Sequence, residues 1–211
     1  MPAMPDRYDE LTRDFRWNVP PRYNIAQACC AHSGTCLKFC ANCGAQVTRR
    51  VPPGDSLPRE VCDACGEIHY RNPKLVVGAI AGYQDRILLC RRAIEPRYGY
   101  WTLPAGFMEN GETAAEAAMR ETLEEAGAHI ELASPFSMIS VPRVNQVHLF
   151  YRARLTDLEF KPGAESIEVA LFDEAKVPWN DIAFRTVGLT LKHWFADRAQ
   201  GGFGFHAEDI K

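Results

Sequence analysis

Residues 106–128 read GFMENGETAAEAAMRETLEEAGA, and this stretch decides how the rest of the chain is interpreted. It joins a glycine-containing loop to an alanine-rich segment with a regular series of glutamates. Thr113, followed three residues later by Glu116, has the pattern of a helix N-terminal capping box, and Gly127 is the residue type that commonly ends a helix. We therefore expect one helix over residues 113–126.

The expected helix brings three carboxylates close together. At about 100° per residue, Glu121, Glu124 and Glu125 fall within a roughly 100° arc of one face. Close pairs of like charges repel by ~1 kcal/mol in water, so a cation must compensate them. Oxygen ligands in this number suit Mg²⁺ or Mn²⁺, which bind phosphate oxygens in turn, whereas a solvated acidic face is the plainer alternative. The residues expected to pack on a sheet lie opposite: Ala115, Met119, Thr122 and Ala126.

The spacing of this stretch resembles the Nudix box, in which a glycine, five residues, a glutamate and seven residues precede Arg-Glu-U-X-Glu-Glu-X-Gly-U, where U is aliphatic. Each invariant glycine and charged position is met, whereas Thr122 and Ala128 occupy the two aliphatic positions. The resemblance implies an α/β fold of the α+β type, a Nudix α/β/α sandwich with a mixed sheet. It also implies hydrolysis of a pyrophosphate with Mg²⁺ or Mn²⁺ as the catalytic metal.

The same resemblance implies roles for single residues of the box. Glu124 and Glu125 are expected to bind the metal ions, with Glu121 assisting and the backbone carbonyl of Gly106 as a further ligand. Arg120 is expected to pair internally, so that the carboxylate helix and the preceding loop stay in register.

An additional carboxylate, either a metal ligand or the general base, is implied at a point beyond the box. The segment GAESIEV, residues 163–169, offers Glu165 and Glu168. We rank Glu165 first because a residue just before a strand can turn toward the metals.

Two CxxC pairs, formed by Cys40 with Cys43 and by Cys62 with Cys65, are separated by 18 residues. This spacing is typical of four-cysteine zinc sites. Four protein ligands leave no open position, so we expect structural Zn²⁺ in a small zinc ribbon over residues 38–72. Two disulfides are the alternative.

The remaining elements place a Nudix domain over residues 73–211. Apolar runs predict strands at 75–83, 86–92, 133–141, 146–155 and 168–172. A helix is expected within 178–198, capped by an Asn or Asp, and the glycine-rich GGFGF after it is expected to be a terminal loop. Residues 1–37 form an N-terminal extension of uncertain order.

Composition bears on the partners and the cellular compartment of the protein. The net charge of -3 gives no strong footprint for nucleic acid, and no apolar run approaches the ~20 residues of a membrane span. Paired cysteines and the lack of a secretory signal pattern at the N-terminus favour the cytoplasm. Nudix domains with N-terminal extensions often pair, so a homodimer is expected.

Resemblance outside the box bears on the substrate. The order of ribbon and Nudix domain is similar to bacterial NADH pyrophosphatases, but the SQPWPF-like signature expected after the box is missing. Residues 71–80, 88–113, 144–155 and 178–187 resemble more closely the zinc-ribbon Nudix hydrolases that include plant FAD pyrophosphatases. This implies a dinucleotide-type substrate, FAD or ADP-ribose. Hydrolysis of NADH, NAD or NAD-capped RNA, and a non-enzymatic ligand-sensing regulator, are the alternatives.

Several side chains are candidates for binding that substrate. Aromatic rings before and within the box could stack on a base or flavin, although Trp101 and Phe107 are as readily explained as core residues. Two polar residues on or near a predicted strand are further candidates. The set is Tyr100, Trp101, Phe107, Asn145 and His148.

Overall fold

The computed structural model describes residues 37–211, so the extension expected over residues 1–37 lies outside the described residues except for its last residue. The described elements are, in chain order, β1 (Val47–Arg50), β2 (Arg59–Cys62), β3 (Ile68–His69), β4 (Lys74–Tyr83), β5 (Arg86–Arg92), β6 (Trp101–Thr102), β7 (Ala105–Phe107), α1 (Ala114–Ala126), β8 (Ile130–Val141), β9 (Gln146–Leu155), β10 (Ser166–Phe172), α2 (Arg185–Gln200) and β11 (His206–Asp209). Short 3-10 turns lie at Pro142–Val144, Glu174–Lys176 and Trp179–Asp181.

The strands form two separate sheets. β1, β2 and β3 make a small antiparallel sheet in the cysteine-rich segment. The larger sheet has the order β10-β5-β4-β9-β8-β11, with β6 beside β5 and β7 beside β4. β4 runs parallel to β9, and β11 runs parallel to β8, whereas the other neighbours are antiparallel. The expected mixed sheet is confirmed.

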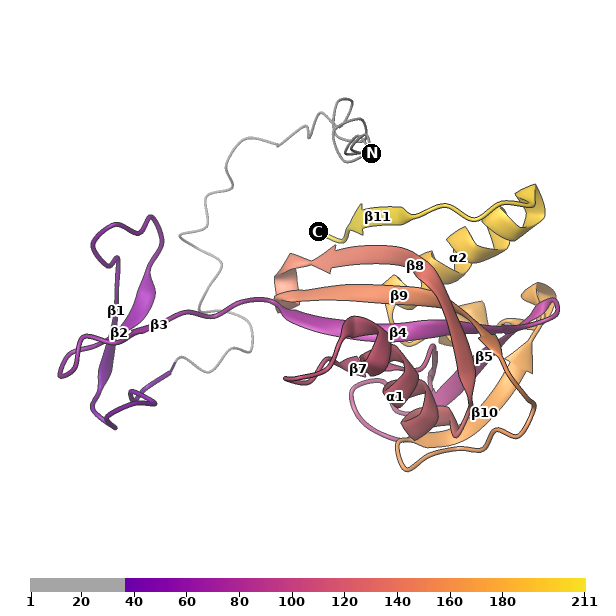
Figure 1. Cartoon of the computed structure of the whole chain (residues 1–211), viewed down its shortest axis with the longest axis horizontal. Helices are drawn as coiled ribbons and strands as arrows, with labels where there is room; N and C mark the ends of the chain where they lie inside the picture. Colours follow the sequence, from indigo (N-terminus) through magenta and orange to yellow (C-terminus); the bar gives the residue numbers. More distant parts are fainter. Residues whose placement is uncertain (1–36) are drawn as a thin grey trace, which may run out of the picture. The chain divides into compact units, whose positions relative to one another are not determined.

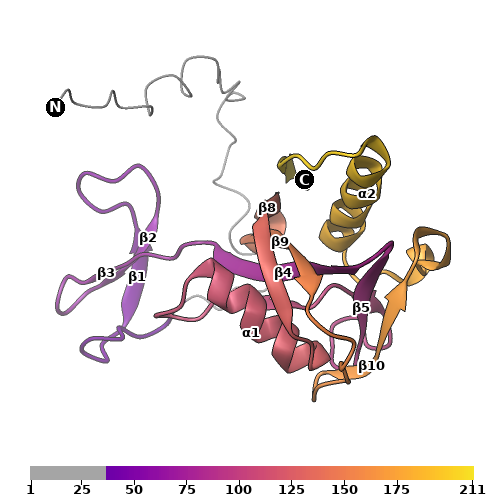
Figure 2. The same ribbon diagram turned by 45° about the vertical axis from the view of Figure 1, so that its right-hand side comes forward.

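The two helices cover opposite faces of the larger sheet. Along β5, Ile87 and Leu89 pack in one core cluster with Leu191 of α2. Leu88, which lies between them in sequence, packs in another cluster with Ala126 of α1. Because successive side chains of a strand point to opposite faces, the helices enclose the sheet between them. The α/β/α sandwich is confirmed, and Figures 1 and 2 show α1 and α2 on its two sides.

Helix α1 begins and ends as the sequence predicts. The Thr113 hydroxyl accepts a hydrogen bond from the Glu116 N–H at 3.2 Å, and the Glu116 carboxylate accepts one from the Thr113 N–H at 2.7 Å. Gly127 ends the helix in the left-handed conformation, with a φ of 58°. These caps satisfy backbone groups that a helix end otherwise leaves without partners.

The buried face of α1 matches the expected one in part, because Thr122 and Ala126 are fully buried. Met119 was expected in the core but is 39% exposed. Glu121 and Glu125 are instead buried, on the same face as Ala117 and Ala118. The helix therefore turns two of its carboxylates toward the sheet, where the backbone of β7 lies against them.

Helix α2 begins later than the sequence suggests. Its N-terminal capping residue is Phe184, which makes no side-chain capping bond, so the expected Asn or Asp cap is wrong. The reason lies in β6: Ile182 forms a parallel bridge with Trp101, and the Ala183 N–H donates to the Trp101 carbonyl at 2.8 Å. The chain is held extended there and turns into a helix only afterwards.

The glycine-rich GGFGF is a loop as expected, but a strand follows it. After Gly201 and Gly202, the chain returns as β11 and pairs with β8 at the edge of the larger sheet. Figure 1 shows β11 beside β8 and near α2. Among the described residues, no helix is both long enough and apolar enough to cross a membrane.

Candidate functional site

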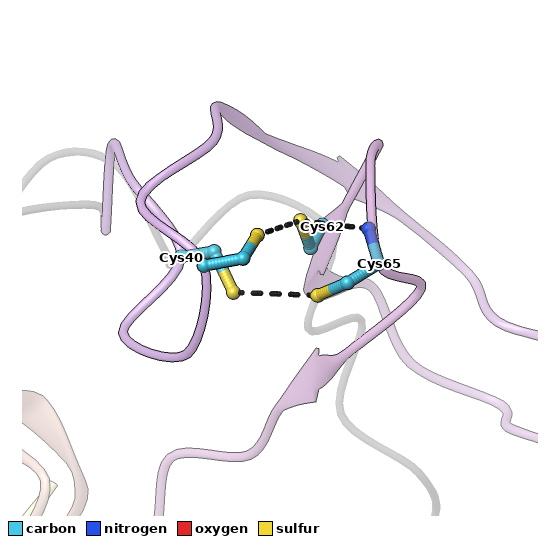
Figure 3. Close-up of side chains that lie close together, drawn as sticks. Cys40, Cys62 and Cys65 are labelled. Atoms are coloured by element: carbon cyan, nitrogen blue, oxygen red, sulfur yellow. Dashed lines mark hydrogen bonds between the residues drawn. The ribbon is translucent and has the colours of Figure 1, made fainter.

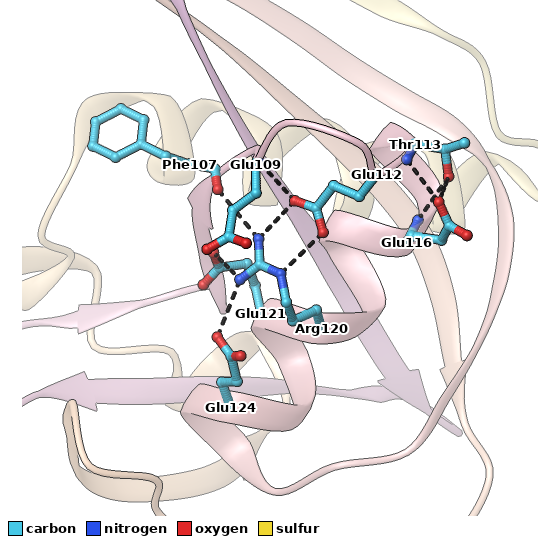
Figure 4. Close-up of polar contacts among 8 residues, drawn as sticks. All are labelled: Phe107, Glu109, Glu112, Thr113, Glu116, Arg120, Glu121 and Glu124. Atoms are coloured by element: carbon cyan, nitrogen blue, oxygen red, sulfur yellow. Dashed lines mark hydrogen bonds and ion pairs between the residues drawn. The ribbon is translucent and has the colours of Figure 1, made fainter.

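Arg120 joins helix α1 to the loop before it. Its Nε donates to Glu112 Oε2 at 3.0 Å, and its Nη2 donates to Glu112 Oε1 at 2.8 Å and to the carbonyl of Phe107 at 3.2 Å. Glu112 Oε1 also accepts the N–H of Glu109 at 2.7 Å. The hydrogen bonds from Arg120 hold the pKa of Glu112 at about 2, so this carboxylate is charged at any ordinary pH. Figure 4 shows the arginine at the centre of these contacts.

The same guanidinium reaches two carboxylates of the helix. Arg120 Nη1 donates to Glu121 Oε1 at 2.8 Å and to Glu124 Oε2 at 3.1 Å. Burial raises the pKa of Glu121 in spite of this contact. One arginine thus faces three carboxylates, counting Glu112, and the cluster keeps an excess of negative charge.

Glu125 is the most deeply buried carboxylate of this cluster. It is 8% exposed, and its Oε2 accepts a hydrogen bond from the Ala105 N–H at 3.3 Å. Burial raises the pKa of Glu125 to about 8, and the charges of Glu121 and Glu165 add to the effect, whereas Arg92 opposes it. A multivalent cation beside such a buried carboxylate would stabilise its charged form.

At Gly106, β7 lies very close to α1, and the absence of a side chain there leaves space for the Glu121 carboxylate. A β-carbon on Gly106 would lie 2.2 Å from Glu121 Oε1, so only glycine fits there with this side chain in place. The Gly106 backbone therefore lies against the Glu121 carboxylate. Carboxylates and carbonyls are the oxygen donors that Mg²⁺ and Mn²⁺ take, so the residues present fit a divalent cation of this class.

The segment between β9 and β10 packs on the last turn of α1. The Gly163 N–H donates to the carbonyl of Glu125 at 3.0 Å, and the Lys161 N–H donates to the carbonyl of Ala126 at 2.9 Å. A β-carbon on Gly163 would lie 1.7 Å from the Glu124 carbonyl oxygen, so a side chain there would force the loop away. This contact satisfies helix carbonyls that otherwise lack partners.

That loop brings one of the two expected later glutamates to the cluster. The carbonyl of Glu165 accepts the N–H of Ala93 at 2.8 Å, and its carboxylate is close enough to raise the pKa of both Glu121 and Glu125. Glu168 pairs instead with Arg91 at 3.7 Å on the neighbouring strand β5. The backbone of Glu165 is therefore held close to the loop that packs on the end of α1, while the roles of both residues remain predictions.

The candidate aromatic residues lie in different settings. Trp101 packs edge-on against Phe172, with ring centres 4.8 Å apart, and belongs to the partly buried rim of the core, which fits its core alternative. Phe107 is 48% exposed, and its ring faces the amine of Lys74 at 4.9 Å. Tyr100 lies 5.3 Å from the guanidinium of Arg97. Phe107 is thus the exposed ring of the three, whereas Tyr100 and Trp101 are partly buried.

The two polar candidates lie in β9 or directly before it. Asn145 is an exposed turn residue whose carbonyl accepts the Lys74 N–H at 2.9 Å. His148 has partners at both ring nitrogens, Gln146 Oε1 at 3.0 Å and Thr186 Oγ1 of α2 at 3.1 Å. His148 therefore faces α2, on the other side of the sheet from α1, and its substrate contact remains a prediction.

Two residues near the cluster were not identified from the sequence. Arg92 is a cation close enough to lower the pKa of Glu125, and Gly163 permits the loop contact described above. Arg92 ends β5 and Gly163 lies in the loop before β10, so both are outside the box and neither has a fixed sequence spacing to its glutamates. For Gly163 the sequence held one weak signal, because this glycine stands just before the glutamates in GAESIEV.

The four paired cysteines gather beside the small sheet, and only Cys62 lies in one of its strands. Figure 3 shows Cys40, Cys62 and Cys65 close together. The four sulfur atoms all lie within 4.8 Å of one another, with 3.7 Å between Cys40 and Cys65 and 3.4 Å between Cys43 and Cys62. These cysteines are free, which contradicts the disulfide alternative. Four sulfurs at ~2.3 Å from a tetrahedral zinc ion would be about 3.8 Å apart. The cluster therefore fits Zn²⁺.

The turns of the cysteine pairs favour thiolates. Gly44 and Gly66 adopt φ values of 75° and 76°, which suit glycine. The Cys65 N–H donates to Cys62 Sγ at 3.4 Å. Although burial opposes the change, backbone N–H groups and His69 lower the pKa of Cys40 to about 6. His69 Nε2 lies 3.3 Å from Cys40 Sγ and is thus a neighbour of the sulfur cluster.

Two family models match the chain side by side. The model described as "Nudix N-terminal" matches residues 38–71, and the model described as "NUDIX domain" matches residues 72–195. The first coincides with the cysteine cluster and the second with the sheet, α1 and most of α2. The division agrees with the order of elements that the structure describes.

Similar proteins include enzymes acting on several nucleotide substrates. An ADP-ribose pyrophosphatase of Methanocaldococcus jannaschii is 34% identical over 113 residues, which is 52% of this chain and 67% of that protein. A NAD-capped RNA hydrolase, NudC, of Chromobacterium violaceum is 32% identical over 160 residues, 74% of this chain and 57% of that protein. The matches cover between 33% and 67% of the length of the first such relatives.

A solved structure resembles nearly the whole described part. The crystal structure of a NUDIX hydrolase from Nitrosomonas europaea is 50% identical, has a TM-score of 0.81, and is similar over 82% of this chain and 99% of that one. Its match, the two adjoining family models and the complete glycine, arginine and glutamate spacing of residues 106–128 agree. The chain belongs to the Nudix hydrolase family, and its Nudix domain is preceded by the zinc ribbon that accompanies this domain.

Proposed function

We propose that the chain hydrolyses the pyrophosphate bond of a nucleoside diphosphate linked to a second moiety, with ADP-ribose or FAD as substrate. The products are AMP and the other phosphorylated half. The observation that carries this proposal is that two carboxylates of α1 face the backbone of β7: Gly106 lies against Glu121, and the Ala105 N–H donates to Glu125. Glu124 stands beside them on the exposed side of α1.

These residues would hold Mg²⁺ or Mn²⁺ through their oxygen atoms. When bound, such a cation neutralises phosphate charge and lowers the pKa of a coordinated water. Arg120, fixed by Glu112, keeps the helix and the loop of Gly106 together, so that the donor atoms stay in place. Glu165, on the loop over the end of α1, is the residue we rank first as the base that accepts a proton from water.

ADP-ribose is favoured among the possible substrates by the similarity to the ADP-ribose pyrophosphatase of M. jannaschii, of which the match covers 67%. The similarity to NAD-capped RNA hydrolases favours a second candidate, hydrolysis of a dinucleotide at the 5′ end of RNA. Both reactions break the same kind of bond, and they differ only in what flanks the phosphates. We further propose that the four cysteines hold structural Zn²⁺, that residues 38–72 and 73–211 are the domains, and that the protein is a homodimer.

The test is a comparison of turnover on ADP-ribose, FAD, NADH and NAD-capped RNA, with Mg²⁺ and with Mn²⁺. We expect kcat/KM to be highest for ADP-ribose or FAD, and we expect chelation of the divalent cation to abolish turnover. In Glu125→Gln, kcat should fall by roughly 100-fold or more. The control is Glu131→Gln, because Glu131 is exposed and pairs with Arg154 on the surface. Unchanged turnover in Glu125→Gln would sink the proposal.

A further inference from the structure

A hollow of about 440 Å³ opens beside the N-terminal end of α2. We call it the basic hollow, because three of its lining residues are cationic and none of its described lining residues is acidic. The cations are Arg97, Arg185 and Lys192, and the aromatic walls are Trp179 and Phe184. Its volume is within the range of small-molecule binding sites.

The cations of the basic hollow have no carboxylate partner in the part of the chain that the structure describes. Arg97 makes its recorded contact with the ring of Tyr100, while Arg185 and Lys192 are exposed and make no ion pair. Arg154 and Lys176, by contrast, are paired with Glu131 and Asp173. Unneutralised positive charge in a hollow attracts an anionic ligand.

Aromatic and apolar surface accompanies this charge. Trp179 is 37% exposed, and Phe184 and Leu189 are partly buried along the wall. The positive end of α2 adds to the field, since Phe184 and Arg185 form its first turn. The combination of cations with a planar apolar wall fits a phosphate attached to a nucleoside.

Arg92 connects the basic hollow to the carboxylate cluster. Its guanidinium lies 5.0 Å from the centre of the Phe184 ring, which lines the hollow. Arg92 also lies opposite Ser166 in the register of β5 and β10, and the next residue, Ala93, donates its N–H to the Glu165 carbonyl at 2.8 Å. The end of β5 therefore borders both the basic hollow and the loop that carries Glu165.

We propose that the basic hollow binds a phosphate of the substrate that lies outside the scissile pyrophosphate. ADP-ribose and FAD contain only the two phosphates of the bond that breaks. The added phosphate has two sources: a phosphate on a ribose of a small dinucleotide, or the first phosphodiester of an RNA that begins with a dinucleotide. This inference rests on the proposed function and specifies its substrate class.

Paired substrates that differ by the added phosphate test this directly. One pair is ADP-ribose and ADP-ribose 2′-phosphate, and the other is NAD and a short RNA whose 5′ end carries NAD. We expect kcat/KM to be higher by about ten-fold for the phosphorylated member of at least one pair, mainly through KM. An advantage in the first pair alone identifies a small dinucleotide, and an advantage in the second identifies RNA.

The variant is Arg185→Ala combined with Lys192→Ala, both exposed positions whose loss leaves the core unchanged. It should lose the advantage of the phosphorylated substrate and keep its kcat/KM for ADP-ribose. Arg154→Ala combined with Lys176→Ala removes the same charge elsewhere and should retain the advantage. Where ADP-ribose is cleaved, the proposal is overturned if no pair shows an advantage, or if the variant at the hollow keeps it.

A binding measurement separates this inference from the proposed function. Adenosine 3′,5′-bisphosphate, titrated without added divalent cation, should bind the wild type more tightly than adenosine does, and the variant at the hollow should lose that difference. If no pyrophosphate substrate is cleaved but this difference is found, the proposed function fails and the basic hollow stands. If ADP-ribose is cleaved and the bisphosphate binds no better than adenosine, the basic hollow fails alone.

Discussion

The guanidinium of Arg120 meets the carboxylate of Glu112 in two nearly parallel hydrogen bonds, of 3.0 and 2.8 Å, across the boundary between α1 and the loop before it. Two donors in a fixed plane set the direction of the carboxylate as well as its distance. The Phe107 carbonyl accepts from the same guanidinium, so the loop that carries Gly106 is joined to the helix that carries the glutamates.

Arg120→Lys keeps the charge and removes this planar pairing. We expect kcat to fall by about ten-fold or more and the free energy of unfolding to fall by about 1–2 kcal/mol, because a lysine amine cannot make both bonds in one plane. Steady-state kinetics and urea unfolding measure the two effects. Arg154→Lys, at an exposed pair, should change neither by much. A fully active Arg120→Lys enzyme would show that the pairing has no positioning role.

Glu165 and Glu168 give a matched comparison for the carboxylate beyond the box. Glu165 adds its charge to the cluster of α1, whereas Glu168 pairs with Arg91. We expect Glu165→Gln to lower kcat by about 100-fold, as loss of a base or metal ligand does, and Glu168→Gln to stay within about two-fold of the wild type. Circular dichroism should be the same for both variants. The reverse order of effects would exchange their assigned roles.

Gly163 positions Glu165 through the packing of its loop on α1. A methyl group there would meet the Glu124 carbonyl oxygen at 1.7 Å, so Gly163→Ala must displace the loop. We expect a loss of about 1–3 kcal/mol in the free energy of unfolding, together with a lower kcat. Gly202→Ala is the control, since nothing lies within 4 Å of its β-carbon position. If both variants unfold at the same urea concentration, the close contact does not matter.

Much of this fold follows from local sequence pattern. The apolar runs of β4, β5 and β9 and the two caps of α1 are signals within a few residues, and the structure confirms them. The four-cysteine cluster follows from spacing alone. These features are predictable because each depends on neighbours in sequence.

The features that could not be predicted depend on distant partners. Residues 206–209 have no alternating apolar pattern, and they form β11 only because the edge of β8 lies beside them. Ile182 is drawn out of the expected helix by its bridge with Trp101. Burial of Glu121 requires the bare backbone of Gly106, which no helical periodicity can indicate. The carboxylate set could be predicted, but not the loop of Gly163 that completes it.

His148 makes part of the stability depend on pH. Burial lowers its pKa from 6.5 to about 4, so the folded protein holds the neutral ring while the unfolded chain takes up a proton as the pH falls. The contribution is fully present above pH 6.5 and is lost between pH 6.5 and about 4. With allowance for its partial exposure, we expect a loss of about 2 kcal/mol over this window.

His148→Gln should remove that part of the pH dependence, because glutamine does not titrate. Urea unfolding at pH 7, 5.5 and 4 measures it for both proteins, and His129→Gln, an exposed position, should keep the wild-type profile. Measurement of KM for ADP-ribose in the same variant tests the predicted substrate contact separately. Identical pH profiles for wild type and His148→Gln would contradict the burial of a neutral ring.

Loss of one cysteine of the ribbon should release the zinc ion. The four sulfurs are the only group of metal-binding side chains of this kind among the described residues, and Cys62 is 1% exposed at the end of β2. A segment of this size has little core of its own, so metal binding supplies a large part of its folding free energy. We expect Cys62→Ser to lower the zinc content from about one ion per chain to near zero. Cys90→Ala removes a buried thiol outside the cluster and should leave the zinc content unchanged.

Four sulfur ligands leave a zinc ion no open position for substrate. Turnover per folded Nudix domain should therefore depend on Mg²⁺ or Mn²⁺ and not on added Zn²⁺. Wild-type protein that purifies without zinc and keeps a folded ribbon would show that this site does not need the metal.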